Sequence, residues 1–274
     1  MKRLLLIAFS LLAIWGTARF CHHQTKGFRL SKIAGNTTCL SQTSPPLPKN
    51  LESTLQQKFC YFARGNQSFS FVSEDGKYIL KFFNNRYQNR LFWLRFTPFK
   101  ARKTLSRQKL AKTFTSYQIA LDHLQKETGL YYLHLAKSCD CPKTTIIDPL
   151  GIEHPIDLNN HAFAVQKKAT MAYPYFAKCA EEKDFDKAKL GFVSLFALLK
   201  KKMELGIGDN DPLIRTNFGF IQDEAVEVDL GPFSYASTTD RHKEITKIAL
   251  PLRHWLENHH PELLPAFYDA LENY

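Results

Sequence analysis

The chain has 274 residues, enough for two lobes or for one large domain with a full hydrophobic core. Its 37 Lys and Arg residues outnumber 26 Asp and Glu residues, so the formal net charge is +11 at pH 7. This excess suits an anionic partner such as a phosphate compound or an acidic lipid surface, or else serves only solubility. A nucleic-acid partner is not expected, and the lack of internal repeats and low-complexity tracts excludes a repeat array.

The first 18 residues have the layout of an export signal. Two basic residues precede an apolar run over residues 4–15, and a small-x-small cleavage pattern ends at Ala18. Extension of the apolar run through Phe20 also permits an uncleaved anchor. We therefore expect residues 1–18 to be a signal peptide or membrane anchor, and the protein to be exported or membrane-anchored.

Residues 19–50 are polar, end in a proline-rich stretch, and are typical of a linker. Among the six cysteines, Cys139 and Cys141 have the spacing of half a metal site. No second Cys or His pair follows at zinc-finger spacing, so ordinary loop thiols or a disulfide are favoured over a metal centre.

Three strands are predicted at residues 59–64, 68–73 and 78–83, joined by short turns as a meander. Gly65 lies in the first turn, which could cover a phosphate. Lys81 is the lone charge inside the apolar third strand. It either points to solvent from one face of the sheet or reaches the phosphates of a nucleotide.

A basic and aromatic segment extends from Arg86 to Arg107. It suits docking on an anionic membrane surface or polyanion, while packing of the aromatic residues alone is the competing interpretation. An amphipathic helix is predicted over residues 105–128, with Gly129 as its stop. Short strands are then predicted at residues 130–135, 144–147, 152–156 and 162–167.

The second half of the chain is mainly helical. A helix is predicted over residues 185–205, beginning after Asp184 and carrying the apolar residues Leu190, Val193, Ala197 and Leu198. Two further amphipathic helices are predicted at residues 242–258 and 261–272.

Between these helices lies a Gly-punctuated acidic loop followed by two short strands. Residues 218–221 are predicted to pair with residues 225–228 as a hairpin, which would place Asn217 beside Asp229. An amide and a carboxylate at one hairpin mouth can share a divalent cation through hard oxygen ligands. Asp209 and Asp211 lie just upstream, where either could orient a hydroxyl group or a water molecule.

Three motifs carry a family resemblance: Gly-Ile-Gly-Asp ending at Asp209, then Asn217, then Val-Asp-Leu-Gly around Asp229. Together they resemble the catalytic loop and metal-binding motif of phosphoinositide 3- and 4-kinases, in the atypical branch of the protein-kinase-like superfamily. The resemblance implies a two-lobed α+β fold. Its antiparallel β N-lobe with one long helix would span residues 51–168, and its mainly helical C-lobe residues 169–274.

The resemblance also implies roles for individual residues in an ATP- and Mg²⁺-dependent phosphotransferase. Lys81 and the turn at Gly65 would hold the phosphates of the nucleotide, and the backbone around Gln166 would bind its adenine. Asn217 and Asp229 would hold Mg²⁺. Asp209, or else Asp211, would orient or deprotonate the acceptor hydroxyl group, and the lead-in sequence favours Asp209.

Several departures from the family pattern keep other functions open. The spacing before Asn217 is stretched, and the long helix lacks a central glutamate to pair with Lys81, a place that Gln118 or Asp122 would have to take. A catalytically impaired pseudokinase, or a protein that binds an anionic membrane surface, is the main alternative. A metal-dependent hydrolase that uses Asp209, Asp211 and Asp229 on water is the third.

Overall fold

The computed structural model describes residues 2–33, 45–85, 100–209, 211–231, 233–235 and 240–273, without the side chains of residues 2–8, 100–107 and 110. The chain forms two compact units: unit 1 is Met1–Pro98 with His134–Ala164, and unit 2 is Phe99–Leu133 with Val165–Tyr274. The predicted docking segment between Arg86 and Arg107 lies outside the described residues, apart from the backbone of residues 100–107.

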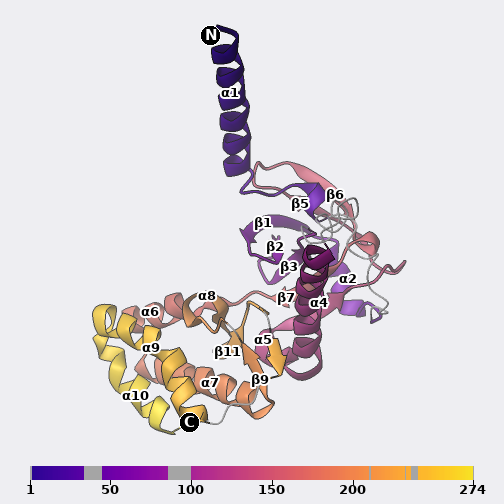
Figure 1. The fold of residues 1–274 in the computed structure, drawn as a ribbon. Coiled ribbons are helices and arrows are strands. Elements are labelled where there is room, and N and C mark those ends of the chain that lie inside the picture. The colour runs from indigo at the N-terminus through magenta and orange to yellow at the C-terminus, as the bar shows by residue number, and fades with distance from the viewer. Residues whose placement is uncertain are drawn as a thin grey trace. The chain divides into compact units, whose positions relative to one another are not determined.

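Unit 1 is built on the central strands of a mixed sheet (Figure 1). Its elements are α1 (Lys2–Gln24), η1 (Leu30–Lys32), α2 (Lys49–Leu55), β1 (Lys58–Arg64), β2 (Ser68–Ser73), β3 (Tyr78–Phe83), β5 (Lys143–Ile147), β6 (Glu153–Asp157) and η3 (Leu158–Asn160). With β4 (Leu130–His134) and β7 (Phe163–Lys167), which both cross the unit boundary, the strand order is β4-β7-β3-β2-β1-β5-β6.

The predicted meander of β1, β2 and β3 is confirmed, and all of its pairings are antiparallel. The expectation of a wholly antiparallel sheet is wrong, because β5 pairs with β1 in parallel. Phe71, Leu80 and Phe82 are fully buried, so the sheet has a continuous aromatic and aliphatic core. Lys81 is half-buried, on the strand face that it shares with the buried residues Ile79 and Phe83.

The segment that follows α1 belongs to the folded unit rather than to a linker. Phe28 and Ile33 are 3% and 0% exposed. The Phe28 ring packs edge-on against Phe69 and Phe71, with centroids 5.3 and 5.4 Å away. Part of the predicted linker over residues 19–50 is therefore core. Within the described part of the chain, no helix combines the length and apolar character needed to cross a bilayer.

Unit 2 contains most of the helices (Figure 1). Its elements are α4 (Lys100–His123), α5 (Gln125–Thr128), β8 (Thr170–Met171), α6 (Ala172–Glu182), α7 (Phe185–Glu204), β9 (Ile207–Asp209), α8 (Ile214–Asn217), β10 (Phe218–Ile221), β11 (Glu224–Glu227), β12 (Phe233–Tyr235), α9 (Arg241–His259), η4 (Pro261–Leu263) and α10 (Leu264–Asn273). The long helix α4 thus groups with unit 2, whereas the sequence placed it in a lobe of residues 51–168.

Helix α7 is the centre of the core of unit 2. It begins at the predicted place because the Asp184 side chain caps it, accepting a hydrogen bond from the backbone nitrogen of Lys187 at 3.0 Å. The predicted apolar stripe through Leu190 and Val193 is wrong, because these side chains are 65% and 40% exposed. The buried face instead carries Ala188, Phe192, Leu195, Phe196 and Leu199, and packs against α6, α9 and α10.

Cys139 and Cys141 form no disulfide with each other. The Asn159 side chain holds the loop that contains these cysteines. Its amide nitrogen donates to Asp157 Oδ1 at 2.9 Å, and its amide oxygen accepts from Ser138 Oγ at 2.8 Å.

Candidate active site

The hairpin predicted from the sequence forms, with a register one residue from the expected one. Strand β10 pairs with β11, and Phe218 lies opposite Glu227. The turn contains two residues, Gln222 and Asp223, both with positive φ (49° and 66°), which is the backbone of a tight hairpin turn. The expected turn of three residues and second strand at 225–228 are therefore each off by one residue.

The register sets the residues at the hairpin mouth. The backbone nitrogen of Val228 donates to the carbonyl oxygen of Asn217 at 2.6 Å. Asn217 therefore lies opposite Val228, and Asp229 is the next residue along the chain. Asn217 is 7% exposed, whereas Asp229 is exposed to solvent. Both candidate Mg²⁺ ligands lie at the same mouth, although not directly opposite each other.

Asn217 is held by the loop that precedes it. Its side-chain nitrogen donates to the backbone carbonyl oxygen of Asp211 at 2.6 Å. The short helix α8 makes this closure possible, because it turns the chain back within six residues. Since the amide nitrogen is engaged, the amide oxygen is the end that remains for a cation.

Asp209 and Asp211 have opposite environments, although they are two residues apart. The Asp209 side chain is 4% exposed, and its Oδ1 accepts from the backbone nitrogen of Asp211 at 2.9 Å. Strand β9 fixes this position, because Asp209 pairs with Phe233 of β12. Asp211 is exposed. Of these two acids, only Asp211 has a carboxylate that an external hydroxyl group can approach.

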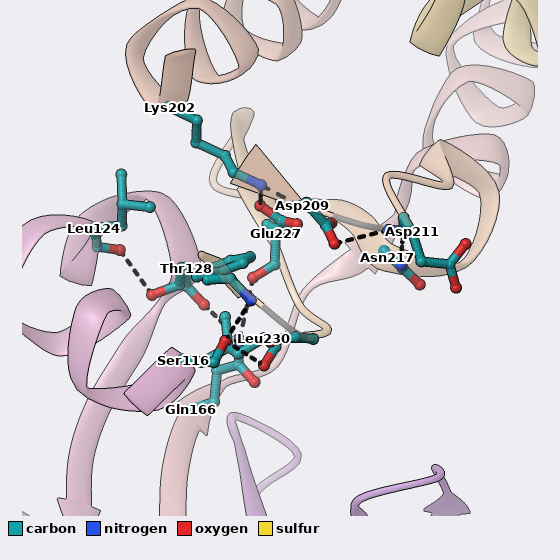
Figure 2. A network of polar contacts seen from close by, with 12 residues as sticks. Ser116, Leu124, Thr128, Gln166, Lys202, Asp209, Asp211, Asn217, Glu227 and Leu230 are labelled. Carbon is teal, nitrogen blue, oxygen red and sulfur yellow. Dashed lines mark hydrogen bonds and ion pairs between the residues drawn. The ribbon is translucent and has the colours of Figure 1, made fainter. Parts of the chain in front are cut away.

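Asp209 belongs to a buried charged triad with Lys202 and Glu227 (Figure 2). The Lys202 Nζ is ion-paired with the Glu227 carboxylate and lies 4.0 Å from Oδ2 of Asp209. The side chains of Lys202, Asp209 and Glu227 are 5%, 4% and 1% exposed. The Phe233 ring lies 4.4 Å from Lys202 Nζ, so the ammonium group also has an aromatic neighbour.

The triad holds two carboxyl groups and one ammonium group, which indicates that it also holds a proton. Glu227 Oε1 and Asp209 Oδ2 are buried, and neither accepts a hydrogen bond from a donor in the described residues. Burial raises the pKa of the Glu227 carboxyl well above its usual range, and Asp209 raises it further against the opposing effect of Lys202. A protonated Glu227 that donates to Asp209 satisfies both oxygens and makes the buried group neutral.

Helix α4 is bonded to the loop that follows Asp229. Ser116 is fully buried, and its Oγ lies 3.1 Å from the carbonyl oxygen of Leu230 and within hydrogen-bond reach of that of Gly231. The same Oγ accepts from the backbone nitrogen of Phe233 at 2.9 Å. This one hydroxyl group therefore fixes the backbone on the C-terminal side of Asp229.

The remaining predicted residues are distributed over both units. Gln166, in the unit 2 part of β7, is 2% exposed, and its amide donates to the carbonyl oxygens of Thr128 (2.5 Å) and Glu227 (3.4 Å). Its side chain is therefore structural, bonded to the backbone of α5 and β11. Lys81 and Gly65 lie in unit 1.

The two helix residues considered as stand-ins for a central glutamate bond to each other. Gln118 Nε2 donates to Asp122 Oδ1 at 2.9 Å on the exposed side of α4. A cavity of about 460 Å³ in unit 2 lies elsewhere, and its lining includes Gly129, Lys167 and Ile221. None of the candidate catalytic or metal residues lines it.

The donor set at the hairpin mouth fits a hard divalent cation. Asn217 and Asp229 supply amide and carboxylate oxygens, which Mg²⁺ prefers, and Mg²⁺ commonly takes only one or two protein ligands beside water and phosphate oxygens. Within the described residues, no group of three or more His, Cys, Asp or Glu side chains gathers as a ready-made metal cage.

Sequence reasoning missed Lys202, Glu227 and Ser116. Lys202 was hidden in a run of three lysines, but it follows Leu195 and Leu199 at helical spacing, on the buried face of α7. Strand β11 carries two glutamates, of which Glu224 is exposed and Glu227 is buried. A charged residue on the buried face of α7 and another on the buried face of β11 form the signal by which the Lys202–Glu227 pair could have been predicted.

Comparisons with known proteins place the chain in no family. No family model matches it, and no curated protein matches it. Among solved structures, it is similar to the complex of Rv3197 with erythromycin from Mycobacterium tuberculosis, with 11% identity over 81% of this chain and a TM-score of 0.34. The match spans 60% of that protein's length. A likeness this slight carries no argument about function.

Proposed function

We propose that the protein is an ATP- and Mg²⁺-dependent phosphotransferase with a two-lobed, kinase-like arrangement of its units. One observation carries the proposal: the bonds of Asn217 to Asp211 and Val228 gather an exposed acid, an amide oxygen and the Asp229 carboxylate at one hairpin mouth. Phosphoryl transfer needs positioned charges more than covalent chemistry by the protein, so few groups suffice.

In this proposal Asn217 and Asp229 hold Mg²⁺, which would neutralise charge on the phosphate oxygens. Asp211 orients the acceptor hydroxyl group and takes its proton. We assign this role to Asp211 rather than Asp209 because Asp209 is buried in the triad and already accepts a hydrogen bond. Asp209 then acts through the backbone of Asp211 as a positioning residue.

The nucleotide's other contacts in this proposal come from unit 1 and from the unit 2 part of β7. Lys81 binds its phosphates, the turn at Gly65 covers them, and the backbone at Gln166 binds its adenine. Lys81 is half-buried on an otherwise apolar strand, and a lysine ammonium group is a common ligand of phosphate, which supports this role.

One observation favours a second candidate, a pseudokinase that binds nucleotide without turnover. Gln118 has no carboxylate, and one oxygen of the Asp122 carboxylate is occupied by Gln118, so neither position carries a carboxylate dedicated to a lysine. The hydrolase alternative is less favoured, since one of its three acids, Asp209, is closed to water.

The test is single-turnover transfer from radiolabelled MgATP, followed as label on any acceptor and as released phosphate. We expect Asp211→Asn to lower the rate by about 10²–10⁴-fold without weakening nucleotide binding. Asp186→Asn, an exposed acid at the start of α7, is the matched control and should retain the wild-type rate. Nucleotide binding with no turnover in the wild type would replace this proposal with the pseudokinase; no binding of any nucleotide would reject both.

A further inference from the structure

The positive charge of the chain is concentrated in its first part. Residues 1–121 contain 20 Lys and Arg residues but only three acids, Glu52, Glu74 and Asp75, a net charge of +17. Residues 122–274 carry a net charge of −6. The basic excess therefore lies within residues 1–121, and this concentration of positive charge favours binding of an anionic partner there.

Part of this excess gathers around Gly27 in unit 1. The group, which we name the Gly27 cluster, consists of Arg19, His22, Lys26, Arg29, Lys32 and Arg64. Lys32 Nζ donates to the Gly27 carbonyl oxygen at 2.5 Å, and Arg64 Nη1 lies 3.5 Å from that of Lys26. These side chains come from α1, from the turn after it, from η1 and from β1.

Gly27 permits this close approach. Its φ is +72°, and a Cβ atom built there would lie 2.1 Å from Arg64 Nη1 and 2.9 Å from His22 Nε2. Two of the cations also pack on aromatic rings. Lys26 Nζ lies 5.4 Å from the centroid of the Tyr61 ring, and Arg64 Cζ lies 5.9 Å from that of the Phe69 ring. Lys26, Lys32 and Arg64 thus have contacts with the fold that position their charged ends, whereas Arg19 and Arg29 are exposed.

The cations of the cluster have no carboxylate to neutralise them. In the described part of the chain, which contains every Asp and Glu of the sequence, none of its lysines or arginines forms an ion pair with an acid. Partial burial, and then Arg64 and Arg29, lower the pKa of Lys32. Like charges held together in this way are stabilised when an anion binds.

The rest of helix α1 indicates which kind of anion binds the Gly27 cluster. Arg19, a member of the cluster, stacks over Trp15 at 5.8 Å, and Trp15 belongs to a set of strongly exposed apolar side chains on α1. That set is Phe9, Leu11, Leu12, Ile14, Trp15 and Phe20, each 62–72% exposed. A soluble phosphate compound would satisfy the cations and leave these side chains in water, whereas a lipid surface satisfies both.

We propose that the Gly27 cluster binds the phosphate headgroups of an anionic phospholipid membrane, while the apolar side chains of α1 enter the adjacent acyl layer. This surface is separate from the candidate active site, so it stands whether or not the protein transfers phosphate. It would concentrate the protein at a membrane and bring it near anionic acceptors.

The test is binding of the full chain to vesicles of phosphatidylcholine with 30% phosphatidylglycerol, measured by co-sedimentation at two salt concentrations. Each cation near such a surface contributes about five-fold to partitioning. We expect Lys32→Gln/Arg64→Gln to weaken binding about 25-fold, and the exposed pair Arg19→Gln/Arg29→Gln to do the same. Lys49→Gln/Lys77→Gln removes the same charge from exposed sites of unit 1 outside the cluster, and should weaken binding less than three-fold.

A second arm distinguishes lipid from free phosphate. Trp15→Ser/Phe20→Ser should weaken binding to the same vesicles, and 10 mM inorganic phosphate should compete poorly. Equal losses in the cluster and control variants would overturn the proposal, as would equal binding to pure phosphatidylcholine. Full competition by phosphate with no effect of Trp15→Ser/Phe20→Ser would identify a phosphate site instead of a membrane surface.

Discussion

The ammonium group of Lys202 and the carboxyl group of Glu227 meet where solvent reaches neither, with side chains 5% and 1% exposed. Lys202 comes from the last turn of α7 and Glu227 from the end of β11, immediately before the Val-Asp-Leu-Gly segment. The pair thus ties the central helix of unit 2 to the strand that leads into the candidate metal loop.

Removal of the lysine should be severely destabilising. In Lys202→Met, Asp209 and Glu227 remain buried without a cation, which costs about 3–5 kcal/mol in the free energy of unfolding. Urea unfolding measures this loss. Lys200→Met, in the same helix and without an ion pair in the described structure, should change it by about 0.5 kcal/mol at most.

A second substitution should relieve that loss. In Lys202→Met/Glu227→Gln only one buried carboxylate is left, so the double variant should be more stable than Lys202→Met alone. If the cost of Lys202→Met is the same in both backgrounds, the two residues are not coupled and the buried triad is not a unit.

The proton assigned to Glu227 predicts a pH dependence of stability. Its pKa is raised in the folded protein from a usual value of 4.5, so between that value and the folded-state pKa the folded protein holds a proton that the unfolded chain has lost. This contribution to stability is complete below about pH 4.5 and is lost as the pH rises through the folded-state pKa. Glu227→Gln should remove that decline.

The measurement is a series of urea unfolding curves from pH 4.5 to pH 9. Relative to Glu227→Gln, the wild type should lose stability as the pH rises. Exposed Glu181→Gln serves as the control and should run parallel to the wild type. A constant difference between the wild type and Glu227→Gln would show that Glu227 has no raised pKa.

The hairpin turn offers a local test of the observed register. Gln222 has φ of +49° and Asp223 of +66°, a conformation that asparagine tolerates better than glutamine. Gln222→Asn should raise the free energy of unfolding by a few tenths of a kcal/mol, and Gln222→Val should lower it by about 1 kcal/mol. If valine is tolerated as well as asparagine, the two-residue turn is not the one formed.

The sequence predicted elements best where a local pattern is complete in itself. Strands β2 and β3 begin and end at the predicted residues, because apolar runs are bounded by turn residues such as Asp75 and Gly76. The short strands β9 and β12 were not predicted, since three residues carry no periodicity and their stability comes from pairing with each other. The predicted register of the hairpin was off by one residue, because the turn of Gln222 and Asp223 contains no glycine that would mark its position in the sequence.

The candidate site was predicted in its residue types more than in its geometry. Asn217 and Asp229 were expected side by side; both lie at the hairpin mouth, but Asn217 is opposite Val228 rather than Asp229. The preference between Asp209 and Asp211 could not be settled from spacing, because it depends on burial by Lys202 and Glu227, which come from another helix and another strand. Nothing local marks Lys202 among three consecutive lysines until the buried face of α7 is known.

The most direct measurement of the central claim is the melting temperature of the full chain with and without nucleotide and Mg²⁺. At ten times the dissociation constant, MgATP should add about 1.4 kcal/mol of stability, and should raise the melting temperature by about 3–5 °C. Asp229→Ala should abolish the Mg²⁺-dependent part of this rise. If no nucleotide changes the melting temperature, or if Asp229→Ala responds like the wild type, the hairpin mouth is not a nucleotide–metal site.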